Sequence, residues 1–335
     1  MARLVLFAHH HLYRWQPHGG EISMAATVEY LQAKEHEILV IVENKKNNIY
    51  EREDYDGISF IVLPQAKFPE AIIDILAWYR PHVALMWSIP ARIAAPICYG
   101  LGIPYILFVR YWHLVNTPPY NDLMTDPINL EVWQDNAWIH QYASSIISNS
   151  ESTRAVIRRF FNVDSIVSYV PVEKLPKLTT GSLITLVNAK KHDGGFLVQR
   201  LAKLNPHLKF QIFDNRDFKD NNITTYSHLD IPYNKLFNDT RLLLFPVTDD
   251  GCGTSRVVFE AHHLDIPILA TAKSGLPEVV PVEHLLPFDS SIEAWSDKLN
   301  WMLDNYNDCI DRIPRWYSAE VELGKVEDAL QAILE

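Results

Sequence analysis

The feature that most constrains the fold of this chain is a regular alternation of short apolar runs with longer segments of helical periodicity. The first apolar run, Arg3 to Phe7, is followed by a helical pattern from Glu21 to Lys34 and by a second apolar run from Glu37 to Glu43. Strands as continuously apolar as these are typical of a parallel sheet that helices cover on both faces. The sequence therefore predicts a doubly wound α/β domain.

A second alternation of the same kind begins at Leu183, after a stretch from Pro171 to Ser182 that lacks periodicity and is typical of a linker. The length of 335 residues also favours two domains, at about 150 residues each. We expect Rossmann-like domains over residues 1–171 and 172–317, and a C-terminal helix over residues 318–335 that packs back on the first domain. Ligands of doubly wound sheets bind outside the carboxyl ends of the strands, so the cleft between the domains is the expected site.

Charge and cysteine content narrow the class of protein. The chain carries 30 Lys and Arg against 41 Asp and Glu, a net charge of -11, which disfavours broad contact with nucleic acid or anionic lipid. The three cysteines are widely spaced, so we expect neither a disulfide framework nor a metal site. No apolar run approaches the roughly 18 residues of a membrane helix. We expect a cytoplasmic protein without a transmembrane segment.

Two glycine-bearing turns stand where a predicted strand leads into a predicted helix. Gly19 and Gly20 follow the first strand, and a longer loop joins the strand that ends at Phe245 to a helix that Thr254 or Ser255 can cap. Glycine lets the backbone approach a ligand closely, and the free amides at a helix start attract phosphate. An ordinary turn explains the same residues, so spacing alone leaves both interpretations open.

Glu260 falls in the second turn of the helix that follows this loop. Its carboxylate is placed to accept hydrogen bonds from the diol of a ribose, and a solvent-exposed glutamate is the alternative. A third turn, from Thr271 to Glu278, follows another predicted strand and supplies amides, a hydroxyl and a carboxylate. A nucleotide ligand at the edge of the second sheet would suit these features, and an ordinary turn between a strand and a helix explains the third segment nearly as well.

Taken in chain order, these motifs resemble a retaining GT-B glycosyltransferase of glycosyltransferase family 4. The motifs that carry the resemblance are Gly19-Gly20, Ser148-Asn149-Ser150 before an arginine-bearing helix, and the block from Pro246 to Glu278 with Glu260-Ala261 and Gly275-Leu276-Pro277-Glu278. The resemblance implies the GT-B fold, in which two Rossmann-like doubly wound domains face each other across a cleft. It also implies metal-independent transfer with retention of configuration, from a UDP- or GDP-type sugar bound mainly by the second domain to an acceptor hydroxyl held mainly by the first.

The resemblance assigns roles to the loop before Glu260. Glu260 matches the second glutamate of the Glu-x7-Glu motif of the family and would hold the ribose, whereas Cys252 stands where the first glutamate touches the transferred sugar. Asp249 or Asp250 could take over the contact with the sugar that this glutamate makes. Alternatively, the backbone amides of Gly253 and Thr254 could make that contact. The donor-binding residues implied are Gly19, Gly20, Asn188, Asp250, Gly251, Cys252, Gly253, Thr254, Ser255 and Glu260.

The residues expected to stabilise the departing nucleoside diphosphate with positive charge also differ from those of the family. Asn188 and Asp193 stand where the family has Arg and Lys, and Lys190 and Lys191 lie between them. Negative charge develops on the leaving group in the transition state, so a cation is required when no metal is bound. We therefore expect Lys190 and Lys191 to act as catalytic cations, with Arg256 in reserve.

The first domain supplies the expected acceptor side. His113 follows the fifth strand, where relatives place a histidine near the reacting sugar, and we expect it to hydrogen-bond within the sugar pocket. Tyr13, Trp15 and Trp112 offer aromatic faces on which an acceptor stacks. The implied acceptor is a glycan, a lipid-linked glycan or a small molecule, and no cofactor is expected beside the nucleotide-sugar substrate.

Three other functions are open on sequence alone. A nucleotide-sugar isomerase on the same fold would need an acid-base cluster, for which His113 with Asp249 or Asp250 is the candidate. A noncatalytic nucleotide-sugar binding module is suggested by Cys252 in place of the first glutamate. A transferase that glycosylates a DNA base keeps the same chemistry, but the net negative charge disfavours it.

Overall fold

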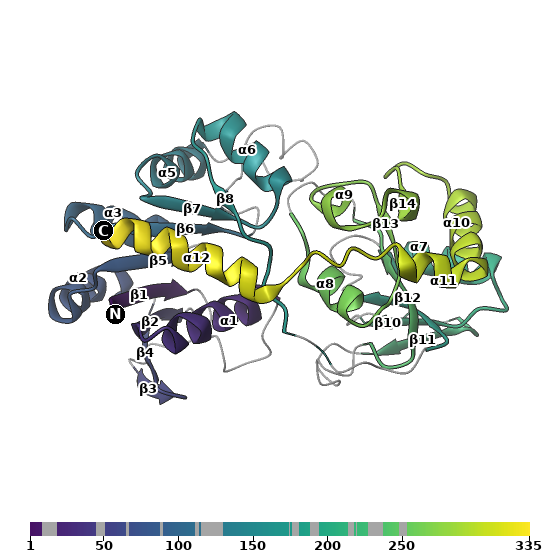
Figure 1. Ribbon diagram of the computed structural model, residues 1–335, viewed down its shortest axis with the longest axis horizontal. Coiled ribbons are helices and arrows are strands. Elements are labelled where there is room, and N and C mark those ends of the chain that lie inside the picture. Colours follow the sequence, from purple (N-terminus) through teal and green to yellow (C-terminus); the bar gives the residue numbers. More distant parts are fainter. Residues whose placement is uncertain are drawn as a thin grey trace. The chain divides into compact units, whose positions relative to one another are not determined.

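The computed structural model shows a mixed α/β chain that divides into two compact units. The first is built from Met1–Pro171 and Ser318–Glu335 together with Gly253, and the second from Val172–Asp250 and Thr254–Tyr317. Each unit contains one predominantly parallel sheet with helices on both faces (Figure 1). The residues that the structure describes are 1–8, 19–44, 51–64, 67–87, 90–110, 114, 130–173, 175, 181–187, 194–213, 218, 220–226, 237–247 and 253–335.

The sheet of the first unit has the strand order β3-β4-β2-β1-β5-β6-β7-β8. Its strands are β1 (Arg3–Ala8), β2 (Glu37–Asn44), β3 (Glu51–Tyr55), β4 (Ile58–Pro64), β5 (Val83–Trp87), β6 (Tyr105–Val109), β7 (Ser145–Ser148) and β8 (Ile166–Val167). All neighbours pair in parallel except β3 and β4, which form an antiparallel hairpin. After β1, the strands β2 to β4 are added on one side of β1, and β5 to β8 are added on its other side. The direction in which strands are added therefore reverses between β1 and β5.

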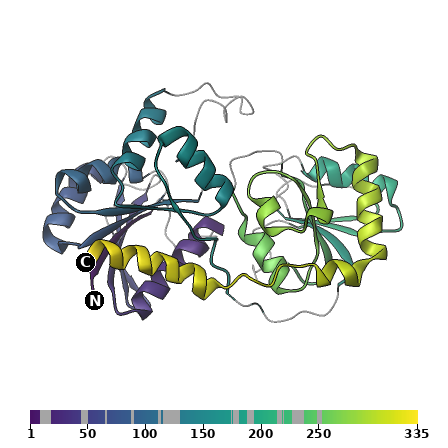
Figure 2. The same ribbon diagram turned by 45° about the horizontal axis from the view of Figure 1, so that its top comes forward.

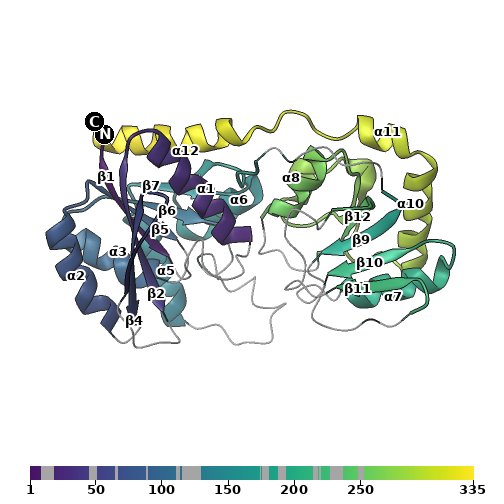
Figure 3. The ribbon, with the colours of Figure 1, turned by 90° about the horizontal axis from the view of Figure 1, so that it is seen from below.

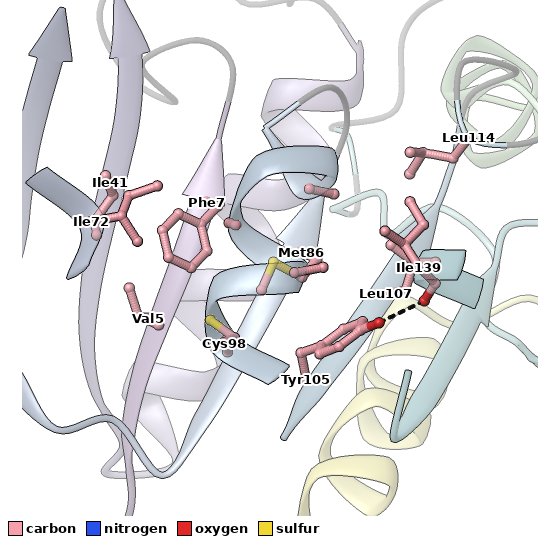
Figure 4. Packing of buried hydrophobic residues seen from close by; sticks show 14 of the residues in the cluster. Val5, Phe7, Ile41, Ile72, Met86, Cys98, Tyr105, Leu107, Leu114 and Ile139 are labelled. Atoms are coloured by element: carbon pink, nitrogen blue, oxygen red, sulfur yellow. Dashed lines mark hydrogen bonds between the residues drawn. The ribbon is translucent and has the colours of Figure 1, made fainter. Parts of the chain in front are cut away.

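The helices of the first unit pack on two faces because the strand side chains alternate. Val5 and Phe7 of β1 join the cluster under α2 (Phe68–Tyr79), α3 (Ala91–Gly100), α5 (Leu130–Gln141) and α6 (Glu151–Phe161). Leu4 and Leu6 of β1 join the opposite cluster with α1 (Gly19–Ala33) and α12 (Ala319–Leu334). Figure 4 shows the first cluster, in which the hydroxyl of Tyr105 donates to the carbonyl of Ile139 over 2.8 Å.

The helix α12 is anchored to the first unit by polar contacts as well as by its apolar face. Its residue Glu322 is buried, accepts from the backbone amide of Tyr169 over 2.9 Å, and accepts from the Nζ of Lys325 over 2.7 Å. Glu327 lies 3.1 Å from the Nε2 of His36, at the start of β2. Figure 2 shows α12 in yellow along the first unit.

The sheet of the second unit has the strand order β11-β10-β9-β12-β13-β14, and every pair of neighbours is parallel. Its strands are β9 (Leu183–Val187), β10 (Phe210–Phe213), β11 (Ile223–Tyr226), β12 (Thr240–Phe245), β13 (Ile268–Thr271) and β14 (Leu285–Leu286). Its helices are α7 (Gly194–Leu204), α8 (Arg256–His263), α9 (Leu276–Val279), α10 (Ile292–Asp304) and α11 (Tyr306–Asp311), with a short 3-10 helix at Val282–His284. Figure 3 shows α7 and α10 near β9 and β10 of this sheet.

Most predicted elements form where the periodicity places them, and one differs in extent. We expect a strand over residues 165–170, but only Ile166–Val167 pairs, as β8 at the sheet edge. Ser168 still donates its amide to Ser148, whereas the next amide, of Tyr169, donates to the side chain of Glu322. Successive amides of a strand point to opposite sides, so the amide of Tyr169 faces the open edge of the sheet, and Glu322 of α12 accepts its hydrogen bond there. Among the described helices, none is both long and apolar enough to cross a bilayer.

Candidate nucleotide-sugar site

The strand order of each unit identifies the edge at which a ligand is expected. In the second unit β9 and β12 are neighbours, while the chain continues from β9 to β10 on one side and from β12 to β13 on the other. In such sheets the ligand crevice lies outside the carboxyl ends of the strands at this point. The helices α7 and α8 begin on this side of β9 and β12, so their first turns are the framework of the candidate site.

The start of α8 is a helix end without a side-chain cap. Ser255 is the N-cap residue in an extended conformation, and its hydroxyl makes no capping hydrogen bond. Thr254 is buried, and Gly253 before it has a φ of +55°, a conformation that favours glycine. Of the predicted glycine-rich loop, Gly253 lies in the described part of the chain and has a conformation that favours glycine, and Ser255 rather than Thr254 stands at the N-cap position.

Glu260 is fully buried in the second turn of α8. Its Oε1 accepts a hydrogen bond from the Nε of Arg256 over 2.6 Å, one helical turn earlier, and Arg256 is only 9% exposed. The alternative of a solvent-exposed glutamate is therefore wrong. A buried carboxylate held by a guanidinium is an acceptor of fixed position, which is what recognition of a ribose diol requires.

The turn after β13 is tied to the segment that leaves β12. The hydroxyl of Thr271, itself buried, donates to the carbonyl of Val247 over 2.6 Å. Ser274 has a φ of +55° and precedes Gly275, the residue before α9. Lys273 lies with its Nζ 4.4 Å from the centroid of the Phe288 ring. The hydrogen bond from Thr271 to Val247 fixes the turns after β12 and β13 to each other at the carboxyl edge of the sheet.

A second glycine pair, which the sequence patterns did not single out, opens α7, the helix after β9. A Cβ on Gly194 would lie 3.0 Å from the Cγ of Pro246, and a Cβ on Gly195 would collide with the ring of Phe218. These glycines let α7 approach the sheet closely, as the helix of a dinucleotide-binding motif does. The signal was available, since Gly194-Gly195 repeats the Gly19-Gly20 pair that opens α1.

In the first unit the structure places Gly19 and Gly20 as the first residues of α1. A Cβ on Gly20 would lie 3.0 Å from the Cζ2 of Trp87, which is itself buried at the end of β5. Gly20 is therefore required for close packing of α1 on the sheet. This structural role accounts for the glycine without the predicted ligand contact.

The Ser148-Asn149-Ser150 motif forms the helix cap that its sequence predicts. Ser150 is the N-cap of α6, and its Oγ accepts from the amide of Thr153 over 2.9 Å. The side chain of Asn149 donates to the carbonyl of Arg110, and accepts from the hydroxyl of Thr153 over 3.0 Å. These bonds join the ends of β6 and β7 at the carboxyl edge of the first sheet.

The remaining predicted residues lie outside the described part of the chain. They are Tyr13, Trp15, Trp112 and His113 in the first unit and Asn188, Lys190, Lys191, Asp249, Asp250, Gly251 and Cys252 in the loops after β9 and β12. The described part of the predicted site thus consists of Gly19 and Gly20 in the first unit, and Gly253, Thr254, Ser255, Arg256 and Glu260 at α8.

Comparison with known proteins identifies the fold. No protein-family model matches the sequence, and no curated protein matches it at the sequence level. Among solved structures, a sucrose-phosphate synthase from Thermosynechococcus elongatus is similar with a TM-score of 0.78 and 13% identity, and the match covers 99% of this chain and 100% of that one. HepE from Anabaena in complex with UDP-glucose is similar with a TM-score of 0.75 and 12% identity, over 99% of this chain and 100% of that one.

An enzyme of a different class shares the architecture. The UDP-GlcNAc 2-epimerase from Neisseria meningitidis bound to UDP-GlcNAc has a TM-score of 0.62 and 12% identity, and the match covers 99% of this chain and 100% of that one. The chain therefore has the fold of GT-B glycosyltransferases across its whole length, and this architecture also carries nucleotide-sugar epimerases.

Proposed function

We propose that this GT-B chain is a retaining, metal-independent glycosyltransferase that moves a sugar from a UDP- or GDP-type donor to an acceptor hydroxyl. The observation that carries the proposal is the Arg256-Glu260 pair at the start of α8, at the edge where a doubly wound sheet binds its ligand. It is supported by the whole-length similarity to proteins such as HepE, whose structure contains UDP-glucose.

In this proposal the second unit holds the nucleotide. Glu260 accepts hydrogen bonds from the ribose, and Arg256 is a positioning residue because its guanidinium donates to that carboxylate. The amides of the first turn of α8 and the backbone at Gly253 face the diphosphate, where the helix dipole favours negative charge. Lys190 and Lys191 supply the cations that stabilise the departing diphosphate.

The reaction exchanges one bond at the anomeric carbon for another. The bond from that carbon to the diphosphate oxygen breaks, and a bond to the acceptor oxygen forms on the same face of the sugar. The acceptor proton passes to the leaving diphosphate, so no protein base is required. His113 hydrogen-bonds the sugar, Asp249 or Asp250 replaces the missing first glutamate, and Tyr13, Trp15 and Trp112 contact the acceptor.

The test is a mass-spectrometric assay of UDP-, GDP- and ADP-sugars with glycan and small-molecule acceptors. Thermal-shift measurements first select the nucleoside diphosphate, since a ligand of the folded state raises the melting temperature. Glu260→Gln is then expected to weaken donor binding and transfer. Glu322→Gln is the matched control, because it neutralises another buried carboxylate, in α12, and is expected to retain transfer. Unchanged transfer by Glu260→Gln would remove Glu260 from the donor site.

A nucleotide-sugar epimerase is the second candidate, favoured by the similarity to the Neisseria enzyme. Incubation with UDP-GlcNAc and with UDP-glucose in the absence of any acceptor separates the two functions. An epimerase converts the sugar while it stays attached to UDP, whereas the proposed transferase leaves it unchanged until an acceptor is added. Donor binding without either reaction would indicate a noncatalytic binding module.

A further inference from the structure

A pocket lies in the first unit at the amino ends of β2 and β4, away from the turns discussed so far. Its volume is about 140 Å³, and its lining includes Gln32, Glu37, Arg52, Ser59, Trp78 and Tyr79. β2 begins at Glu37 and β4 at Ile58, so the pocket opens at the edge opposite to the carboxyl ends of these strands. It is therefore separate from the predicted donor and acceptor residues, and an inference about it goes beyond the proposed function.

One wall of the pocket is aromatic. Trp78, at the end of α2, is 63% exposed, while its neighbour Tyr79 is buried and donates its hydroxyl to the carbonyl of Glu37 over 3.1 Å. The guanidinium carbon of Arg52 lies 5.9 Å from the centroid of the Trp78 ring. Because this cation already stands at the indole, a second cation would be repelled, and the pocket does not suit an ammonium ligand.

The rim of the pocket is polar, and its acidic and basic side chains balance. Ser59 donates its hydroxyl to the Oδ1 of Asp54 over 2.6 Å, and Gln32 donates to the carbonyl of Asp56 over 3.2 Å. The exposed side chain of Glu37 lines the opening. Among the lining residues the one carboxylate, of Glu37, offsets the one guanidinium, of Arg52, so the charges of the lining favour a neutral ligand. The carboxylate oxygens of Glu37 accept hydrogen bonds from hydroxyl groups.

The size of the pocket limits the ligand further. Sites for drug-sized ligands have volumes of about 300–1,000 Å³, so a pocket of about 140 Å³ admits a single ring and excludes a nucleotide. A neutral ring with several hydroxyl groups satisfies the charge, the aromatic wall and the volume together. Its weakly positive C–H groups are attracted to the negative face of an indole.

We propose that this pocket binds one neutral sugar ring of a glycan, which packs its C–H face on Trp78 and donates hydroxyl hydrogen bonds to Glu37. The remainder of the glycan extends into solvent from the pocket opening. Such a site holds a saccharide on the first unit independently of the donor. A single stacked ring with few hydrogen bonds has an affinity in the millimolar range.

Saturation-transfer difference NMR tests the proposal with glucose, maltose, cellobiose and diacetylchitobiose as probes, in the presence of excess UDP. We expect at least one neutral sugar to bind, and Trp78→Ala to weaken its binding by about tenfold or more. The substitution should leave the fold intact because most of the indole is exposed. Circular dichroism and the melting temperature check this directly.

The matched control is Trp301→Ala in the second unit. Trp301 is also a partly exposed helical tryptophan, at 38%, with a cation near its ring, since the Nζ of Lys298 lies 4.7 Å from the centroid. This variant is expected to bind the sugar as the unsubstituted protein does. The proposal is overturned if none of the four sugars binds, if binding survives Trp78→Ala, or if choline or acetate binds more tightly at this site than the sugars. None of these results depends on whether the protein transfers sugar.

Discussion

The buried pair of Arg256 and Glu260 provides a quantitative prediction about the second unit. The two side chains are 9% and 0% exposed, and a hydrogen bond of 2.6 Å joins them, so neither charge is well solvated by water. Removing one partner of such a pair costs about 3–5 kcal/mol, because the other charge loses the group that offsets its desolvation. We therefore expect Glu260→Ala to lower the free energy of unfolding by about that amount, and Glu260→Gln, which keeps an oxygen acceptor, by less.

A double-mutant cycle measures the interaction itself. Replacing both residues with Met removes the charges together, and a buried ion pair replaced by apolar groups of similar size is often neutral or stabilising. The double variant Arg256→Met/Glu260→Met is thus expected to be more stable than Glu260→Met alone, with a coupling energy of about 2 kcal/mol.

Urea unfolding followed by far-UV circular dichroism gives the four free energies, with each transition fitted separately if the two units unfold in two steps. The physical reasoning would be refuted if the two single substitutions were additive within about 0.5 kcal/mol. Additivity would mean that the pair is solvated or that the carboxylate has another dominant partner. The same measurement shows which Glu260 variant is folded enough for the transfer assay.

Three further predictions concern other parts of the chain. Burial lowers the pKa of His140 from 6.5 to about 4. Between these pH values the unfolded chain binds a proton at this histidine and the folded protein does not. The free energy of unfolding should therefore fall by up to about 3 kcal/mol as the pH drops from 6.5 to about 4. His140→Phe should reduce the pH dependence of the melting temperature between these two values, to which the buried His262 and His284 also contribute, and an unchanged profile would exclude His140 as a source. Gly195→Ala is expected to destabilise the second unit by about 1–3 kcal/mol in urea unfolding, because the added Cβ collides with Phe218, and a neutral effect would show that the ring moves aside. Ser150→Ala should cost about 1 kcal/mol through loss of the bond to the Thr153 amide, whereas Ser150→Asp, which keeps an acceptor at the cap, should retain most of that stability.

Local patterns predicted the elements that build the sheets. The second alternation begins at Leu183 as predicted, with β9 (Leu183–Val187), and the predicted arginine-bearing helix after Ser150 forms as α6 (Glu151–Phe161), because apolar continuity and helical periodicity are properties of adjacent residues. The hairpin of β3 and β4 was missed, although Asp56-Gly57 is a signal for a tight turn and both residues have a positive φ. The helix α5 was missed as well, because its sequence Leu130–Gln141 interrupts its apolar residues with polar ones and lacks a clear stripe.

The sequence by itself determined the doubly wound fold class and the place of α8 after β12, since both follow from the order and spacing of neighbouring residue types. Only the tertiary structure decided the environment of Glu260, the truncation of β8 and the close approach that requires Gly195. Burial of a carboxylate, the hydrogen bond from the amide of Tyr169 to Glu322 and the contact with Phe218 all depend on residues brought together by packing. These contacts depend on how the helices pack on the sheet, and local periodicity in the sequence does not encode them.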